Sequence, residues 1–380
     1  MVDVVRSAVG ISRVELAEVT GLTQPSISNI VRDLIADGIV HETGSAESAR
    51  GKPRKLLAIS PANRFGVGFQ LGPESLTCVA VDLTGGVIGR EVVPLTGADL
   101  TDSLAARFDD FTTALDLPRD RIEGLAIVSP TANPALEGSF PEWDAVRAAL
   151  ADRLRLPVLV ENDAAAAALG EFWSRRISRE QSFGSVYLST GIGAGLVFGG
   201  ALFRGASFDA GELGHLSIAF DGRECPCGNQ GCVERYASMT AIVEAARADP
   251  GLAARLELTG NVASAYDSLA LAAVSGDAAA HAVIDTAAGL LNVAVTSMVN
   301  LLDLERLVLT GPGMAVAGSI YARSLRAHLT RTAHARHRHE VVVELSAQPR
   351  DAASIGAAAL IVQASIAPGH TADFSRRLPA

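Results

Sequence analysis

The 380-residue sequence predicts an α/β protein in which an N-terminal winged helix-turn-helix precedes two α/β lobes with a cleft between them. Residues 1–60 contain two helical patterns followed by a hairpin pattern. From about residue 65, strand-like segments followed by alternating helices and strands occur twice. The expected bounds are 1–60 for the head, 61–162 plus about 350–368 for a small lobe, and 163–349 for a large lobe.

A capping box predicts the first helix of the head. Ser12 is followed three residues later by Glu15, a pair that satisfies backbone N–H groups at a helix start, and Gly21 ends the helix. Thr23 can cap a second helix with Pro25 in its first turn. Apolar residues at helical spacing predict its buried face: Ile27, Ile30, Val31, Leu34 and Ile35.

The opposite face of this second helix carries polar side chains that can reach base edges in a major groove: Gln24, Ser26, Ser28, Asn29 and Arg32. Apolar segments at 39–40 and 56–59 flank a polar loop and predict a two-stranded wing. An ordinary helical hairpin with a polar outer face is the alternative interpretation.

The predicted wing holds a basic cluster on an otherwise acidic chain. Lys52, Arg54 and Lys55 lie together there, whereas the net charge of the chain is −10. A local basic spot is where a polyanion docks, so we expect these three side chains to contact phosphates of double-stranded DNA.

After a short linker, the pattern of strands and helices indicates the two lobes. Strand-like segments lie at 65–71, 77–83 and 87–93, followed by a helix at about 101–115, a strand at 124–128, a helix at 143–154 and a strand at 157–160. The pattern restarts at 184–189 and 195–198, with helices near 278–302 and a strand at 307–309.

The composition indicates a globular protein. Hydrophobic residues make up 48% and charged residues 19% of the chain. The sequence has no unbroken apolar run of about eighteen residues and no signal-peptide pattern at its start. Together with thiols placed for metal binding, this predicts a cytoplasmic protein without a membrane partner.

His215, Cys225, Cys227 and Cys232 lie within eighteen residues and are the strongest motif of the chain. Three thiolates and a neutral imidazole form the closed tetrahedral shell that Zn²⁺ prefers at structural sites, so we expect one structural zinc per chain. An accidental cluster, or a disulfide with one spare thiol, is the alternative. Cys225 and Cys227 are too close in sequence for comfortable disulfide geometry.

Four segments together resemble the ROK family of repressors, open reading frames and sugar kinases, which has a two-lobed, actin-like and hexokinase-like fold: 161–171, 189–195, 211–215 and 225–234. Residues 50–54 resemble the wing of the family's repressors; its kinases lack the winged helix. The resemblance implies a sugar site formed by Asn162, Asp163, Glu212, His215 and Glu234. In a kinase, Asp163 would be the general base. Asp163 can also serve as a helix N-cap.

Two departures from the family pattern argue against a kinase. Where the kinases carry an aspartate for the metal and the nucleotide, this sequence has Gln70, and Pro73 replaces a glycine in the same turn. A loop that carries a sugar-binding Asn in relatives is shorter here, with Ser139 near that place. The glycine-rich loop at 190–195 is kept; it can cradle an anion or serve only as a tight turn.

The sequence therefore predicts a sugar-responsive transcriptional regulator, a repressor that acts as a homodimer or higher homo-oligomer, without catalytic residues. Its effector would be a sugar or sugar phosphate in the cleft. An ATP-dependent, glucokinase-like sugar kinase with a DNA-binding head is the alternative. A DNA-binding protein whose cleft is only structural is a third interpretation.

Overall fold

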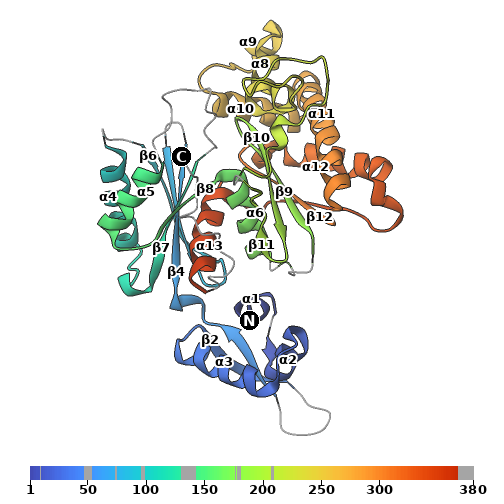
Figure 1. Cartoon of the computed structure of the whole chain (residues 1–380). Coiled ribbons are helices and arrows are strands. Elements are labelled where there is room, and N and C mark those ends of the chain that lie inside the picture. Colours follow the sequence, from blue (N-terminus) through green and yellow to red (C-terminus); the bar gives the residue numbers. More distant parts are fainter. Residues whose placement is uncertain are drawn as a thin grey trace.

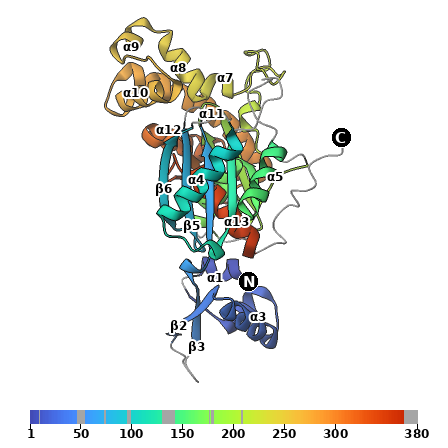
Figure 2. The same cartoon turned by 90° about the vertical axis from the view of Figure 1, so that its left-hand side faces the viewer.

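The computed structural model describes residues 1–8, 10–46, 54–72, 75–95, 99–129, 143–175, 177, 181–206 and 209–366. They form a head and two α/β lobes (Figure 1). The head lies at one end of the molecule, below the lobes (Figure 2). Each part contains one β-sheet of the described chain. The predicted fold class is confirmed.

The head combines three helices with a sheet of order β1-β3-β2. Its elements are α1 (Val2–Ser7), β1 (Ile11–Ser12), α2 (Arg13–Thr20), α3 (Gln24–Ala36), β2 (Val40–Ala46) and β3 (Arg54–Ile59). The capping box is present: the Glu15 N–H donates to Ser12 Oγ at 3.3 Å, and the Ser12 N–H donates to the Glu15 carboxylate at 2.8 Å. Gly21 ends α2 in the left-handed region, with φ of 69°.

Helix α3 buries its apolar stripe, with Ile27 and Val31 at its centre. Thr23 caps it by accepting the Ser26 N–H at 3.4 Å. The sequence gives little signal for α1, because six residues are too few to repeat a helical pattern and the N-cap, Met1, has no side-chain oxygen that could cap the helix. Packing of α1 against β3 stabilises this helix.

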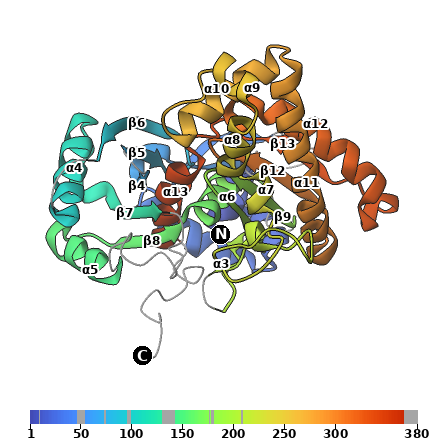
Figure 3. The same cartoon turned by 90° about the horizontal axis from the view of Figure 1, so that it is seen from above.

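The small lobe follows a 3₁₀ turn, η1 (Pro61–Asn63), and has a sheet of order β6-β5-β4-β7-β8. Its strands are β4 (Phe65–Leu71), β5 (Ser75–Asp82), β6 (Val87–Pro94), β7 (Ile122–Ser129) and β8 (Val158–Asn162). Helices α4 (Leu100–Ala114) and α5 (Trp143–Leu154) cover its outer face, with a 3₁₀ turn η2 (Arg119–Arg121) before β7 (Figure 3).

The large lobe has a second sheet, of order β11-β10-β9-β12-β13. Its strands are β9 (Phe183–Leu188), β10 (Ile192–Phe198), β11 (Ala201–Leu202), β12 (Arg306–Thr310) and β13 (Val342–Leu345). Its helices are α7 (Glu234–Ala237), α8 (Met239–Arg247), α9 (Pro250–Arg255), α10 (Val262–Val274), α11 (Ala278–Leu302) and α12 (Met314–Thr332), with 3₁₀ turns η3 (Leu213–His215) and η4 (His334–His337).

Two buried helices cross between the sheets: α6 (Asp163–Ser174) and α13 (Ala352–Ile366) (Figure 3). Their contact is close because it is made at glycines. A Cβ on Gly356 would overlap the Ala166 carbonyl oxygen, and a Cβ on Gly170 would lie 2.9 Å from the Gly356 nitrogen. Helix α6 starts at the end of β8 and packs on β9 and β10, so it connects the small lobe to the large one.

Helix α11 is the one helix of the described chain that is long and apolar enough to cross a membrane. Half of its apolar window is buried inside the large lobe, where it packs against α10 and α12. Its burial and its packing partners therefore identify α11 as a core helix of the large lobe.

Candidate functional site

His215 and three cysteines converge on one point beside the start of α7. The ligand atoms of His215, Cys225, Cys227 and Cys232 all lie within 4.8 Å of one another. Gly228 and Gly231 turn the loop with φ of 89° and 72°, values that side-chain-bearing residues rarely adopt. The loop thus folds the three thiols back onto the imidazole.

The donor spacings fit a tetrahedral ion. The sulfurs of Cys227 and Cys232 are 3.7 Å apart, and Cys225 Sγ lies 3.6 Å from His215 Nδ1. Tetrahedral bonds of about 2.3 Å to sulfur and about 2.0–2.1 Å to nitrogen give separations of about 3.8 and 3.6 Å. A disulfide would need about 2.05 Å between sulfurs. The four side chains form a cluster that can hold a metal ion.

The His215 ring connects this cluster to the predicted sugar residues. Its Nδ1 faces the thiols, and its Nε2 lies 3.7 Å from Glu212 Oε2. Glu234, two residues after Cys232, begins α7 and accepts the Ile192 N–H at 2.9 Å. Contacts around a metal-binding side chain fix its orientation. The position of His215 therefore depends on Glu212, and the position of Glu234 depends on the neighbouring Cys232.

Asn162 and Asp163 lie at the start of α6, where the two lobes meet. Asn162 caps the helix by accepting the Ala165 N–H at 3.0 Å, and Asp163 Oδ1 accepts the Ala164 N–H at 2.8 Å. The interpretation of Asp163 as the N-cap was wrong. Asn162 has the extended cap conformation and Asp163 is the first helical residue, because the strand continues one residue further.

Asp163 lies in an apolar setting next to other predicted site residues. It is 8% exposed, and burial raises its pKa to about 6, while the Ala164 N–H lowers the pKa and the charge of Glu212 raises it. Burial, followed by the charge of Asp163, raises the pKa of Tyr187 well above its ordinary value. Asp163, Glu212 and Tyr187 therefore share one site.

Gln70 occupies the place of the kinase aspartate and forms a contact between the lobes. Its Nε2, at the end of β4, donates to Tyr187 Oη on β9 at 3.0 Å. An amide bonded to a neutral phenol offers no negative charge to a metal's water shell. Pro73 and Ser139, the other departures from the kinase pattern, lie outside the described residues.

Sequence reasoning missed a buried ion pair beneath this site. Arg204 Nε donates to Glu161 Oε2 at 2.9 Å, and both side chains are buried. Glu161 directly precedes Asn162, and Arg204 begins the segment that leads to Glu212. A carboxylate at the end of a buried strand was the available signal, since it requires a partner.

On the head, α3 presents most of the predicted base-contacting residues to solvent. Gln24, Ser28, Asn29 and Arg32 are exposed. Ser26 is half-buried, and its hydroxyl pairs with that of Thr23 at 2.9 Å. Four of the five side chains are therefore available for contact with an external ligand.

The wing is less basic than its sequence suggests. Arg54 and Lys55 begin β3 and are exposed, while Lys52 lies outside the described residues. Glu42 on β2 pairs with Lys55 and also with Arg13, whose Nη2 lies 3.0 Å from it. Hydrogen bonds from Lys55 and then Arg13 lower the pKa of Glu42. The negative charge of Glu42 thus offsets part of the positive charge of the wing. Arg13 also belongs to this group of cations, because it pairs with the same carboxylate.

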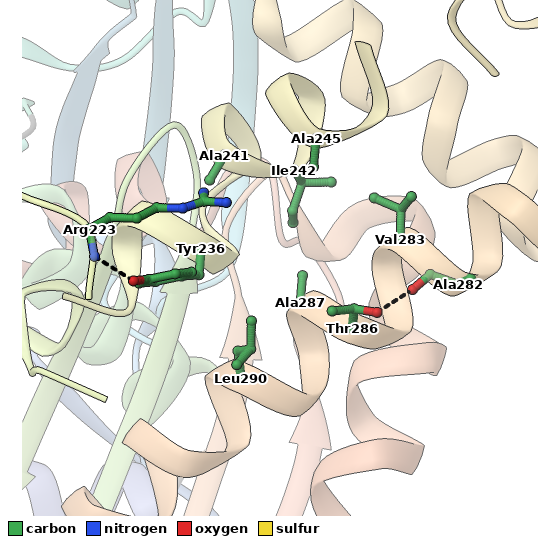
Figure 4. Close-up of a pocket in the computed structure, with 10 residues that line it drawn as sticks. All are labelled: Arg223, Tyr236, Ala241, Ile242, Ala245, Ala282, Val283, Thr286, Ala287 and Leu290. Carbon is green, nitrogen blue, oxygen red and sulfur yellow. Dashed lines mark hydrogen bonds between the residues drawn. The ribbon is translucent and has the colours of Figure 1, made fainter. Parts of the chain in front are cut away.

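A shallow groove of about 310 Å³ lies beside the metal loop, between α8 and α11 (Figure 4). The Arg223 guanidinium stacks 4.7 Å from the Tyr236 ring at its edge. Its remaining wall consists of alanine, other aliphatic side chains and Thr286. Because a sugar site needs several donors and acceptors, this groove is unsuited to an effector sugar.

The sequence matches a known protein family over most of its length. The sequence profile of the ROK family matches residues 67–364. The chain belongs to the ROK family. A xylose repressor from Caldicellulosiruptor bescii is 27% identical over 368 residues, covering 93% of this chain and 92% of that protein.

Solved structures of the ROK family share the fold. A ROK family transcriptional regulator, described as a homologue of the Escherichia coli MLC protein, has a TM-score of 0.73 and 27% identity and covers 93% of this chain and 92% of its own. A ROK family glucokinase from Streptomyces griseus, in complex with glucose and AMPPNP, has a TM-score of 0.65 and 26% identity. It covers 78% of this chain and 98% of its own. Relatives that match nearly the whole chain thus include a repressor and a transcriptional regulator.

Proposed function

We propose that this protein is a sugar-responsive transcriptional repressor whose winged helix binds double-stranded DNA and whose cleft binds a sugar or sugar phosphate. The observation that carries the proposal is the exposed polar face of α3 on a head attached to a ROK body. The similarity to a xylose repressor over 93% of the chain supports the same assignment.

In this proposal the sugar hydroxyls are held by Asn162, Asp163, Glu212, His215 and Glu234. Carboxylates accept hydrogen bonds from hydroxyls, and the Asn162 amide can both donate and accept. The metal ion is a structural Zn²⁺ bound by His215 and the three cysteines. Its role is to hold His215 and the α7 segment that carries Glu234 in place.

For DNA, Gln24, Ser28, Asn29 and Arg32 would read base edges, and Ser26 would assist from its half-buried position. Lys52, Arg54 and Lys55 would bind phosphates. We propose a homodimer or higher homo-oligomer, because two heads can bind two half-sites of one operator. We also place the protein in the cytoplasm, where DNA and free sugars are both present.

The second candidate function, an ATP-dependent sugar kinase, has the retained Asp163 and the glycine loop in its favour. Phosphoryl transfer needs Mg²⁺ and the nucleotide phosphates held by charge. The neutral Gln70, already bonded to Tyr187, opposes that role. We therefore propose that the protein has no catalytic residues.

The test pairs a thermal melting screen with DNA binding. The probes are D-xylose, D-glucose and their phosphates, and the DNA is selected by the protein from a random duplex library. We expect a sugar to raise the melting temperature and release DNA. Glu212→Ala and Glu234→Ala should lose both sugar effects and keep sugar-free DNA binding. Loss of DNA binding in these variants would make the two residues structural.

Two further measurements separate the candidates. Asn29→Ala should cost about 1–3 kcal/mol on the selected DNA only, whereas Lys52→Ala with Lys55→Ala should weaken binding to every duplex. A coupled assay with ATP, Mg²⁺ and each sugar should show no turnover. Turnover that Asp163→Asn abolishes would establish the kinase instead.

A further inference from the structure

The head is attached to the body at two places. The first is the linker η1, which binds the small lobe. The Leu83 N–H, at the end of β5, donates to the Pro61 carbonyl at 3.3 Å. Arg64, directly after the linker, forms a 2.6 Å ion pair with Glu123 on β7. These contacts fix the linker end of the head to the small-lobe sheet.

The second attachment is helix α1, which binds the last turn of α6 (Figure 1). Arg6 Nη1 donates to the Trp173 carbonyl at 2.9 Å, and the guanidinium lies 4.6 Å from the Trp173 ring and 5.7 Å from the Phe172 ring. Arg6 is 3% exposed and lies 3.8 Å from the carboxylate of Asp3, which is also buried. Arg6 is therefore held against Trp173 both by a hydrogen bond and by its position over the ring, at a place that is shielded from water.

Helix α1 also belongs to the head. It packs against β3 of the wing sheet, and Val2 and Val5 share one hydrophobic core with Leu57 of β3 and with Phe172 and Trp173 of α6. A movement of the end of α6 is therefore passed to the head through close-packed side chains.

The end of α6 contacts the large lobe and also packs on α13. Phe172 contacts Phe183 of β9 edge-to-face at 6.1 Å, and Arg175, just after the helix, donates to the Leu345 carbonyl of β13 at 2.6 Å. The other end of the same helix carries Asn162 and Asp163. Trp173 lies ten residues after Asp163 in the same helix, so the proposed sugar site and the Arg6 contact are about 15 Å apart along its axis.

A cavity of about 430 Å³ lies between the small lobe and this end of α6. Residues 84–87 of the β5–β6 turn line one side, and Glu171 and Arg175 line the other. The β5–β6 turn lies next to the end of α6 at this cavity, since a Cβ on Gly85 would lie 3.7 Å from Trp173 Cβ, and Arg6 is buried against the same tryptophan.

We propose that α1 transmits the state of the cleft to the DNA-binding head. The linker is bound to the small-lobe sheet, whereas α1 is bound to the end of α6, which packs on β9 and β10 of the large lobe as well as on α13, so a change in the angle between the lobes changes the orientation of the head. Arg6, through Trp173, is the residue that couples the two motions. The link to an effector rests on the proposed function, whereas the mechanical coupling rests only on these contacts.

The first experiment measures hydrogen exchange in the full-length chain. Arg6→Ala should speed exchange about tenfold both in α1 and in the last turn of α6. The matched control is Arg119→Ala: Arg119 lies 4.9 Å from the Phe108 ring and donates to the Leu154 carbonyl at 2.7 Å, within the small lobe. The control should leave both segments unchanged. Faster exchange in α1 alone, with α6 unchanged, would overturn the proposal.

The second experiment measures the sugar effect on DNA affinity with D-xylose and D-glucose as probes. We expect the wild type to change DNA affinity on the order of tenfold. Arg6→Ala should keep the sugar-induced melting shift and sugar-free DNA binding, while the change in DNA affinity falls below about twofold. A full sugar effect in Arg6→Ala would refute the coupling. If wild type binds neither probe, the proposed effector fails and hydrogen exchange decides the mechanical coupling.

Discussion

The metal cluster and the proposed sugar site share His215, yet they are assembled in different ways. The four ligands of the cluster lie within eighteen residues, and most residues from 220 to 230 are exposed, although Cys225 and Cys232 are buried. The sugar site draws on the start of α6, on η3 and on α7, and buried helices hold it together. We therefore expect the cluster to depend on a bound ion for its order, and the proposed sugar site to depend on the packed fold and on the cluster beside it.

Disruption of the cluster should have the largest effect. Cys227→Ser should remove the bound zinc, reduce the unfolding free energy by about 2–5 kcal/mol and abolish the sugar-induced melting shift, because His215 and Glu234 lose their support. Metal analysis and thermal melting measure both effects.

Cys78→Ala is the matched control, because Cys78 is a free buried thiol on β5 outside the cluster. It should keep the full metal content. DNA binding by Cys227→Ser without sugar should persist, since the head lies at the other end of the molecule. A metal-free wild type with unchanged melting would rule out the structural role of the ion.

The same contrast explains what the sequence could predict. The cluster, the capping box at Ser12 and the Thr23 cap depend on residues close in the chain, so spacing was sufficient. The Gln70–Tyr187 bond joins residues 117 apart, and the Arg6–Trp173 bond joins residues 167 apart. Their formation depends on how the lobes and the head pack, which no local pattern encodes.

The family resemblance identified the residues of the proposed sugar site from the sequence, but not the residues that support them. Asn162 and Asp163 were named from the motif, whereas Arg204, which pairs with Glu161 under them, was not. Motif residues are recognised by identity. A supporting residue such as Arg204 can come from any segment that the fold brings near.

A change of intermediate size is expected in the pH dependence of the unfolding free energy, which reports on the buried Asp163. The pKa of Asp163 is raised to about 6 by burial, so the charged form is disfavoured in the folded protein. The contribution of Asp163 to stability should therefore decline as pH rises from about 4 to about 6. Asp163→Asn should remove this loss, with a gain of about 2–3 kcal/mol at pH 7 and none at pH 4.

Urea unfolding at pH 4, 5, 6 and 7 measures this difference. Asp152→Asn, which replaces an exposed carboxylate on α5, is the control and should show no such trend. A gain for Asp163→Asn that is equal at every pH would mean that Asp163 is not the titrating group.

The smallest effect is expected in the wing, where the ion-paired residues are distant in sequence and are not buried. Glu42 pairs with Lys55 and Arg13 across the head, and its lowered pKa keeps it ionised at neutral pH. DNA phosphates must compete with this carboxylate for both cations. Glu42→Gln should therefore raise duplex affinity severalfold in moderate salt and steepen the salt dependence by roughly one phosphate contact.

The control is Glu18→Gln, which replaces an exposed carboxylate on α2. Weaker binding by Glu42→Gln would mean that Glu42 positions the two cations for DNA, and an ion pair at the surface would then be part of the binding site.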